Sequence, residues 1–263
     1  MIRFKMHSIY DHYPDRHPVD GEPYIECYSD SKVVECTQPG KNIAWMLEPR
    51  SMIGEYYNYV QQNAHLFRYI FTHDSILLKL PQARPFNWAE VWLTTDSEKN
   101  KGISICSSFK DWCPLHKART WLAEYYDQHP GQVDTFGSYK GDRDAWIDAK
   151  EYLEHYRYSI IIENDIDYLW YTEKILNCFA TKTVPIYVGS PTIGEKFNAA
   201  GIIQAQNCDQ IPRIVGQLDI ENDYISRIDA INDNFTRLDY YRTPWKERFI
   251  CDYGDILEGL QYE

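Results

Sequence analysis

The chain has 263 residues, 44% of them hydrophobic, which is enough to build one large core or two modest ones. Its formal net charge of −12 argues against non-specific binding to nucleic acid or to an anionic membrane surface. No apolar run approaches the ~18 residues that span a bilayer. The seven cysteines are odd in number and form no zinc-ligand spacing, which favours a reducing compartment. We therefore expect a cytoplasmic protein, which could be peripheral to a membrane.

The predicted elements alternate between strands and helices along the chain. Short apolar runs bounded by polar residues are typical of strands, and apolar positions three or four apart are typical of helices. Strands are expected at Tyr24–Tyr28, Ile43–Leu47, Arg68–Phe71, Glu90–Leu93, Ile103–Ser107, Gln132–Phe136, Tyr158–Ile162, Val184–Val188 and Ile202–Ala205. Helices are expected at residues 51–64, 114–128, 146–155, 171–181, 208–218, 221–233 and 243–261. This alternation indicates parallel sheets with crossover helices.

A polar segment at residues 95–102 divides the pattern into two groups of elements. It reads Thr-Asp-Ser-Glu-Lys-Asn-Lys-Gly. We place a domain boundary here, with a first domain over residues 1–101 and a second over residues 102–263. The predicted fold class is α/β, with two Rossmann-like domains.

The most informative stretch begins with the predicted strand at Tyr158–Ile162. Its apolar residues run without polar alternation, as in a strand that is buried on both faces. Glu163 and Asn164 then end the apolar run. Open α/β sheets bind ligands beyond the carboxyl ends of their strands. These two side chains are therefore candidates for a ligand site.

A helix predicted from about Tyr171 follows this strand. Thr172 or a neighbour is placed to cap it, which puts Glu173 and Lys174 in its first turn. Unpaired backbone N–H groups at that end favour an anion, whereas a lysine there is not explained by helix stability. A bound diphosphate would explain the lysine.

This pattern resembles the donor-binding signature of the α-1,3/1,4-fucosyltransferases, glycosyltransferase family 10. That signature is roughly a strand ending in Phe-Glu-Asn, then Tyr-x-Thr-Glu-Lys, then Val-Pro-hydrophobic-x-Gly. The match is close over residues 158–197 and weaker over residues 44–137. It departs at Asp165, where the family has Ser, and at Trp170, where the family has Tyr.

The resemblance implies the GT-B arrangement, in which two α/β domains face a cleft. It implies inverting transfer of L-fucose from GDP-fucose to a hydroxyl of an oligosaccharide or glycan acceptor, with an α-1,3-type linkage. The second domain would bind the donor and the first the acceptor, through loops such as residues 11–22 and 80–89. The final helix, from about Pro244, could cross back onto the first domain. Donor-binding positions are Arg119, Asn164, Trp170, Glu173, Lys174, Ser107, Lys110 and Gly137.

Arg119 and Lys174 are the cations that a nucleotide diphosphate would need in this acidic chain. The planar guanidinium of Arg119 can hold two phosphate oxygens at once. Together the two cations could neutralise the departing nucleoside diphosphate, a role that a divalent metal has in the other large class of glycosyltransferases. We therefore expect that no cofactor is required and that a divalent metal is at most stimulatory.

Glu48 is the candidate catalytic base. It follows the predicted strand Ile43–Leu47 and precedes Pro49, so its carboxylate should lie at a strand's carboxyl end on a stiffened backbone. An inverting transfer needs one carboxylate to take the proton of the attacking hydroxyl. Glu48 could instead be a turn residue, and Glu55 and Asp74 are then the substitutes.

Two other interpretations remain open from the sequence. Asp165 and Asp167 form an Asp-x-Asp pair, which could share a metal ion as in GT-A glycosyltransferases. Asp142 and Asp144 show that such pairs also arise by chance in an acidic chain. Alternatively, the chain could be a sugar-nucleotide or glycan-binding module without catalysis. Glu48 distinguishes a binding module from an enzyme, because an enzyme needs a catalytic base and a binding module does not.

Overall fold

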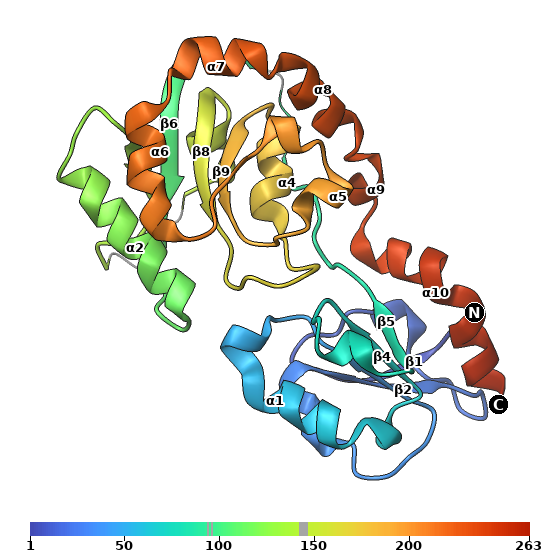
Figure 1. Ribbon diagram of the computed structural model, residues 1–263. Coiled ribbons are helices and arrows are strands. Elements are labelled where there is room, and N and C mark those ends of the chain that lie inside the picture. The colour runs from blue at the N-terminus through green and yellow to red at the C-terminus, as the bar shows by residue number, and fades with distance from the viewer. Residues whose placement is uncertain (94, 96, 142–146) are drawn as a thin grey trace. The chain divides into compact units, whose positions relative to one another are not determined.

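The computed structural model describes residues 1–93, 95, 97–141 and 147–263, which form two compact α/β units (Figure 1). The first unit comprises Met1–Trp88, Asp167–Trp170 and Thr243–Glu263. The second comprises Ala89–Ile166 and Tyr171–Arg242. The division therefore falls at Trp88 and not at the polar segment, and the final helix groups with the first unit.

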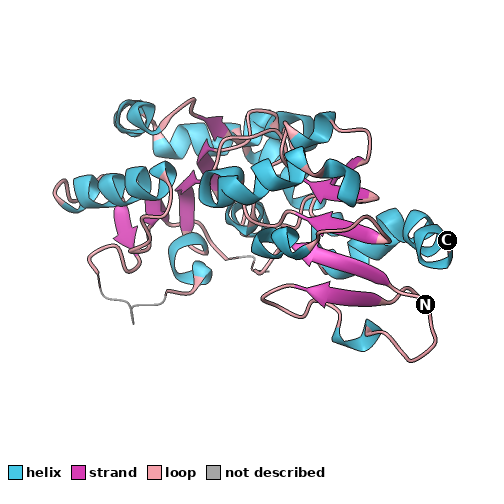
Figure 2. Ribbon diagram, turned by 90° about the horizontal axis from the view of Figure 1, so that it is seen from below, coloured by secondary structure: helices cyan, strands magenta, loops and turns pink. Residues whose placement is uncertain are grey.

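The first unit is built on a five-stranded parallel sheet with the order β1-β2-β3-β4-β5. Figure 2 shows strands of this sheet running in one direction. The two edge strands were missed from the sequence, because each has only three or four residues and a charged residue interrupts its apolar run. The strands are β1 (Phe4–His7), β2 (Ile25–Ser29), β3 (Asn42–Trp45), β4 (Tyr69–Thr72) and β5 (Ala83–Pro85).

Successive residues of β3 point to opposite faces of this sheet. Ala44 packs in a core with Tyr57 of helix α1 (Arg50–Gln62). Trp45 packs in a second core with Phe249 of helix α10 (Trp245–Tyr262). Four short 3₁₀ helices, at Pro14–Arg16, Asp30–Glu35, Ala64–Leu66 and Leu77–Lys79, complete the unit.

Helix α10 covers the face of the first sheet that its three crossover connections do not cover. The connections β2–β3, β3–β4 and β4–β5 contribute Val33, Val60 and Leu77 to the same core. A sequential parallel sheet with right-handed crossovers places its connections on one face. The opposite face therefore needs an apolar cover from elsewhere in the chain, which α10 supplies.

The second unit is also built on a parallel sheet, with the order β10-β9-β8-β6-β7. Strands β7 and β8 lie on opposite sides of β6, so the strand order reverses there. The strands are β6 (Lys101–Cys106), β7 (Asp134–Phe136), β8 (Tyr156–Ile162), β9 (Val184–Val188) and β10 (Ile203–Gln204).

The strand predicted at Glu90–Leu93 is absent. These residues are described and have no strand assignment. The backbone N–H of Val91 instead donates to the Tyr241 carbonyl, and those of Trp92 and Leu93 donate to the Asn177 side chain. An apolar run without a neighbouring strand to pair with cannot form a ladder.

Helices cover both faces of the second sheet (Figure 1). Leu122 of α2 (Pro114–Asp127) packs in the core on one face, and Ile175 of α4 (Glu173–Ala180) packs in the core on the other. The helix predicted at 221–233 is two helices that meet at Arg227. The others are α3 (Ala149–Leu153), α5 (Ile193–Lys196), α6 (Ile211–Gln217), α7 (Ile220–Ser226), α8 (Ile228–Thr236) and α9 (Asp239–Arg242), with 3₁₀ turns at Ala199–Gly201 and Cys208–Gln210. Within the described ranges, no helix has the length and apolar content needed to cross a bilayer.

Candidate active site

The second unit has a cavity of about 270 Å³ at the ends of two neighbouring strands. It lies at the carboxyl ends of β6 and β8, where the strand order reverses, which is where open α/β sheets bind ligands. Residues near the N-termini of α2 and α4 complete its wall. Three of the predicted donor-binding residues meet here. The lining residues are Cys106, Ser108, Arg119, Tyr152, Ile160, Ile161, Ile162, Glu173 and Lys174.

Glu163 anchors the start of helix α4 beside this cavity. Its buried carboxylate accepts hydrogen bonds from the Thr172 backbone N–H at 2.9 Å and from the Thr172 hydroxyl at 2.8 Å. Thr172 caps the helix, as predicted, by accepting from the backbone N–H of Lys174. The Lys174 Nζ lies 3.6 Å from the Glu163 carboxylate and 3.2 Å from that of Glu173. One strand-end carboxylate thus organises both the helix cap and the lysine.

The two cations of the cavity are charged at neutral pH. Burial would lower the pKa of Lys174, but the carboxylates of Glu173 and Glu163 outweigh burial and raise the pKa. Burial lowers the pKa of Arg119 and the charge of Glu163 opposes that shift, and an arginine remains protonated in proteins. The Arg119 side chain is buried, so its charge is poorly screened by water. Such a pair suits an anionic ligand.

Asn164 is oriented by two side chains of helix α2. Its Oδ1 accepts from Arg119 Nη2 at 3.1 Å and lies 3.0 Å from His116 Nε2. Arginine only donates, so the amide oxygen must face it. Burial, together with the positive charge of Arg119, lowers the pKa of His116 to about 4. The His116 ring is therefore neutral at pH 7 and donates to Asn164 through Nε2.

Three more predicted donor-binding residues surround the end of β6. Ser107 is buried, and its hydroxyl lies 3.2 Å from the Thr120 hydroxyl. Lys110 is exposed, with Nζ 4.8 Å from the centroid of a Trp112 ring. Gly137 has a φ of +96°, and a Cβ there would lie 2.2 Å from the Ser107 carbonyl oxygen. Close backbone packing therefore explains this glycine, and contact of any of the three with a donor stays a prediction.

Trp170 groups with the first unit, whereas helix α4 belongs to the second. Its buried ring packs against His73, with 4.4 Å between the ring centroids. Its Nε1 has no hydrogen-bond partner within the described part of the chain. The donor-binding role that the sequence assigned to Trp170 stays a prediction.

Glu48 follows strand β3 in the first unit, beyond the carboxyl end of that strand. Its side chain is exposed, whereas its backbone is held from two sides. The Glu48 N–H donates to Asp30 Oδ1 at 3.2 Å, and the Glu48 carbonyl accepts from the Tyr57 hydroxyl at 2.6 Å. The position suits a carboxylate that must be reached by a substrate. The catalytic role itself stays a prediction.

Asp74, a substitute for Glu48, is held in structural contacts. It is 1% exposed, and its carboxylate accepts from Arg50 at 2.7 and 2.9 Å and from the Leu77 N–H at 2.7 Å. Burial would raise the pKa of Asp74, but the Arg50 guanidinium outweighs burial and lowers it. Such a carboxylate is a poor proton acceptor. Glu55, the other substitute, is exposed on helix α1.

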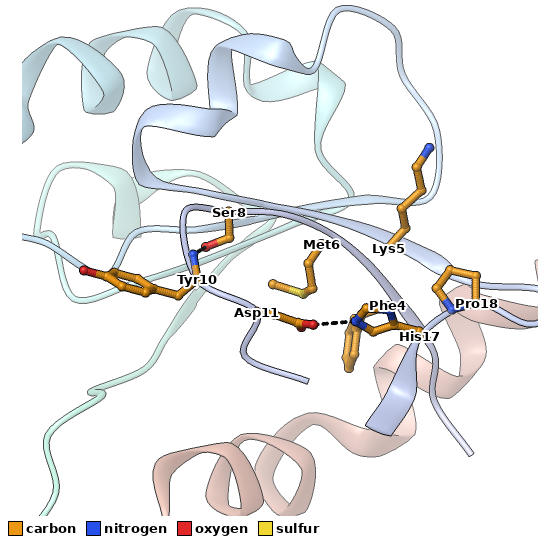
Figure 3. A pocket seen from close by; sticks show the side chains of 8 residues that line it. All are labelled: Phe4, Lys5, Met6, Ser8, Tyr10, Asp11, His17 and Pro18. Carbon is orange, nitrogen blue, oxygen red and sulfur yellow. Dashed lines mark hydrogen bonds and ion pairs between the residues drawn. The ribbon is translucent and has the colours of Figure 1, made fainter. Parts of the chain in front are cut away.

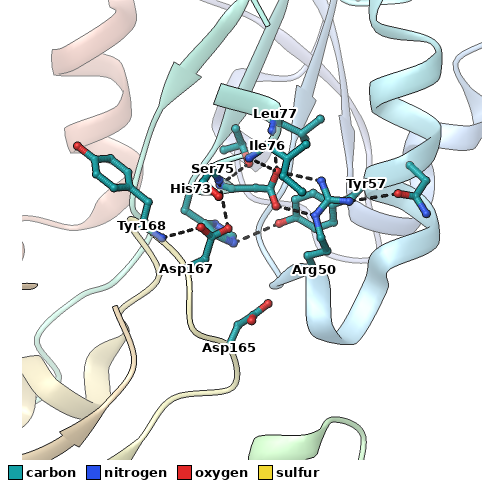
Figure 4. Close-up of polar contacts among 12 residues, drawn as sticks. Arg50, Tyr57, His73, Ser75, Ile76, Leu77, Asp165, Asp167 and Tyr168 are labelled. Carbon is teal, nitrogen blue, oxygen red and sulfur yellow. Dashed lines mark hydrogen bonds and ion pairs between the residues drawn. The ribbon is translucent and has the colours of Figure 1, made fainter. Parts of the chain in front are cut away.

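The Asp-x-Asp pair is divided between the units. Asp165 belongs to the second unit, and Asp167 belongs to the first, where it accepts from the Ser75 N–H at 3.1 Å (Figure 4). Among the residues that the structure describes, no three His, Cys, Asp or Glu side chains are grouped to hold a metal ion. The second pair, Asp142 and Asp144, lies outside the described residues.

Comparison with known proteins identifies relatives for parts of the chain. No family model matches it. Over 110 residues it is 27% identical to a fucosyltransferase-like protein of Arabidopsis thaliana, covering 42% of this chain and 21% of that protein. Over 57 residues it is 33% identical to an α-(1,3)-fucosyltransferase of Helicobacter pylori, covering 22% of this chain and 12% of that enzyme. Parts of the chain are thus similar in sequence to fucosyltransferases. The matches span about a fifth and an eighth of the lengths of these two proteins.

Solved structures of glycosyltransferases share the fold of this chain. An α1,3-fucosyltransferase solved with GDP has a TM-score of 0.57 at 16% identity, over 92% of this chain and 82% of that one. A pneumococcal O-GlcNAc transferase solved with UDP and GlcNAc has a TM-score of 0.54 at 9% identity, over 91% of this chain and 57% of that one. The α/β fold of the GT-B glycosyltransferases, predicted from the sequence, is confirmed.

The first unit also has a recess of about 230 Å³ beside edge strand β1 (Figure 3). The loop after β1, in which acceptor recognition was expected, forms part of its wall. Here His17 Nε2 lies 2.6 Å from Asp11 Oδ2, and Tyr10 is exposed. The recess is lined by Phe4, Lys5, Met6, Ser8, Tyr10, Asp11, His17 and Pro18.

Sequence reasoning did not find how several residues organise the two regions. Its position directly after a buried strand made Glu163 a candidate for a ligand site, whereas in the structure its carboxylate anchors the start of helix α4. Asp30, Tyr57 and His73 gave no local signal. Their contacts join elements that lie apart in the sequence.

Proposed function

We propose that this chain transfers L-fucose from GDP-fucose to a hydroxyl of an oligosaccharide or glycan acceptor. The observation that carries the proposal is that Arg119 and Lys174 line one cavity at the switch point of a parallel sheet. The sequence relatives support fucosyl transfer as the activity. The related solved α1,3-fucosyltransferases, with GDP in one structure and GDP-fucose in another, support the choice of donor.

The cavity of the second unit would hold the diphosphate of the donor. Arg119 presents several N–H donors in a plane, which suits phosphate oxygens. Lys174 adds an ammonium group beside the N-terminus of α4, where backbone N–H groups also favour an anion. Glu173 lines the same cavity, and a carboxylate only accepts hydrogen bonds, so it suits the ribose hydroxyls.

Glu48 would act as the general base. Its carboxylate takes the proton of the acceptor hydroxyl as the hydroxyl oxygen forms a bond to C1 of fucose. The bond from C1 to the phosphate oxygen breaks, and GDP leaves with that electron pair. A single displacement of this kind inverts C1, so a β-linked donor gives an α-linked product, of α-1,3 type by the family resemblance.

The positive charges of Arg119 and Lys174 would stabilise the departing GDP. The same stabilisation can come from a divalent ion, and here two side chains would provide it. We therefore include in the proposal that no cofactor is required and that a divalent metal is at most stimulatory.

Binding and transfer can be tested in two steps with the purified chain. Calorimetric titration should give saturable binding of GDP and GDP-fucose, with UDP as the control nucleotide. Incubation with labelled GDP-fucose and a glycan array should then label a subset of glycans. Binding without label on any glycan would favour a binding module. Preference for UDP, or no nucleotide binding, would overturn the donor assignment.

A further inference from the structure

Both peptide groups of Glu48 are held by side chains from other elements of the first unit. Asp30, at the carboxyl end of β2, accepts with one oxygen from the Leu47 N–H at 2.7 Å and from the Glu48 N–H at 3.2 Å. Tyr57, on helix α1, donates its hydroxyl to the Glu48 carbonyl at 2.6 Å. The Glu48 backbone is therefore fixed on its N–H side and on its C=O side.

The backbone conformation of Asp30 and the burial of its carboxylate are both energetically unfavourable. Asp30 has a φ of +45°, in the left-handed region that residues with a Cβ rarely adopt. Burial raises the pKa of Asp30 to about 7, the negative charge of Glu48 adds to the rise, and the two backbone N–H groups oppose it. Strained backbone and desolvated carboxyl groups persist where the surrounding structure requires them, and they gather at functional sites.

The Tyr57 hydroxyl has a second partner in His73, which follows strand β4 (Figure 4). Tyr57 is fully buried, and its oxygen lies 3.2 Å from His73 Nε2. Burial lowers the pKa of His73 to about 4, so the ring is neutral. Because the Tyr57 proton is used toward Glu48, His73 donates through Nε2 to the Tyr57 oxygen. The chain of donors runs from His73 through Tyr57 to the Glu48 carbonyl.

We propose that Asp30 and Tyr57 are positioning residues for Glu48, which hold its backbone so that the exposed side chain starts from a fixed point and direction toward the acceptor hydroxyl. This proposal rests on the proposed function of Glu48. A long exposed side chain has rotational freedom of its own, so a fixed backbone reduces what must be ordered before proton transfer.

The kinetic test compares four variants with the unmodified chain. Asp30→Ala and Tyr57→Phe should each lower kcat for fucosyl transfer about 10- to 100-fold, as expected for a misplaced catalytic group. The KM for GDP-fucose and the Kd for GDP should stay within about twofold in both. Asp30→Asn keeps an acceptor oxygen and should recover much of kcat. Tyr59→Phe is the matched control, since Tyr59 donates from the same helix to the Cys36 carbonyl at 2.8 Å.

Hydrogen exchange at the Leu47 and Glu48 amides tests whether Asp30 holds the Glu48 backbone, and this test does not depend on enzyme activity. Both amides should be protected in the unmodified chain, exchange faster in Asp30→Ala, and regain protection in Asp30→Asn. Unchanged exchange in Asp30→Ala would overturn the proposal even if transfer is absent altogether. Faster exchange with unchanged kcat would also overturn it. Loss of transfer from the unmodified chain would count against the proposed function, and the exchange result would still decide whether Asp30 holds this turn.

Discussion

The two candidate regions use their polar contacts in opposite ways. In the second unit the side chains expected to contact the ligand also contact each other, as Arg119 does with Asn164 and Lys174 does with Glu163. In the first unit the contacts hold the backbone of Glu48 and leave its side chain exposed. An anion site benefits from charges that are fixed in advance, whereas a base needs a carboxylate that a substrate can reach.

The sheets differ in a way that matches this contrast. The second sheet reverses its strand order between β7 and β8, and the cavity lies at that reversal. The first sheet keeps sequential order from β1 to β5, so it has no such reversal among the described strands. Its strand-end turn is organised instead by Asp30 and Tyr57, which come from other elements.

The largest expected effect separates binding from catalysis. Glu48→Gln keeps the shape of the side chain and removes its basicity, so fucosyl transfer should fall by ~10²–10⁴ while GDP-fucose binding stays nearly unchanged. Initial rates and calorimetric titration of the same preparation measure both. Glu55→Gln, an exposed carboxylate of helix α1, is the control and should keep full activity. Loss of binding together with transfer would give Glu48 a structural or donor-binding role.

The next effect is a loss of stability at low pH, which is caused by buried His73 in the first unit. His73 is buried, and its pKa is lowered to about 4 in the folded chain against 6.5 for an unperturbed histidine. The unfolded chain therefore binds more protons between these values, so this contribution to stability is complete above about pH 6.5 and is lost as the pH falls toward 4. The loss should reach about 3 kcal/mol.

Urea unfolding between pH 7 and pH 4 can measure that contribution. His73→Gln keeps a donor for Tyr57 and cannot take up the proton, so its stability should fall less steeply over this range. His65→Gln, which alters an exposed histidine of the same unit, should fall as steeply as the unmodified chain. Equal slopes for His73→Gln and the unmodified chain would show that His73 is not held neutral.

A comparable effect is expected on donor binding in the second unit. Arg119→Ala and Lys174→Ala should each weaken GDP binding by about 1.5–3 kcal/mol, as for charge-assisted hydrogen bonds. Their effects should be less than additive, because both cations would contact one ligand. Lys150→Ala, an exposed lysine of the same unit, is the control.

Calorimetry should be done well below the melting temperature of each variant. Lys174→Ala leaves the buried Glu163 without its nearest cation, so this variant should also be less stable than Arg119→Ala. Unchanged GDP affinity in both variants would end the assignment of this cavity to the donor.

The smallest expected effect is that of metal removal. If Arg119 and Lys174 provide the positive charge for the departing diphosphate, excess EDTA should lower the transfer rate by no more than a few fold. The product should show an inverted anomeric centre by NMR. Complete loss of activity that Mn²⁺ restores would revive the pair Asp165 and Asp167 as metal ligands.

Residues that act through short sequence separations were predictable. Thr172 and Lys174 lie within one helical turn, so an apolar run, a cap and a first turn placed both beside the expected strand end. Trp170 shows the limit of this reasoning. It lies two residues before the cap, yet it packs on His73 in the other unit, and nothing in the local pattern indicates that partner.

The sequence by itself determined the parallel α/β class, the strand–helix motif at Glu163–Lys174 and the strand-end position of Glu48. Each follows from the hydrophobic period and from capping, which act over a few residues. Only the tertiary structure decided that α10 covers the first sheet, that Glu90–Leu93 forms no strand, and that Asp30 and Tyr57 hold Glu48. These depend on which surfaces remain to be buried and which backbone groups remain to be paired after the strands assemble, and neither is specified locally.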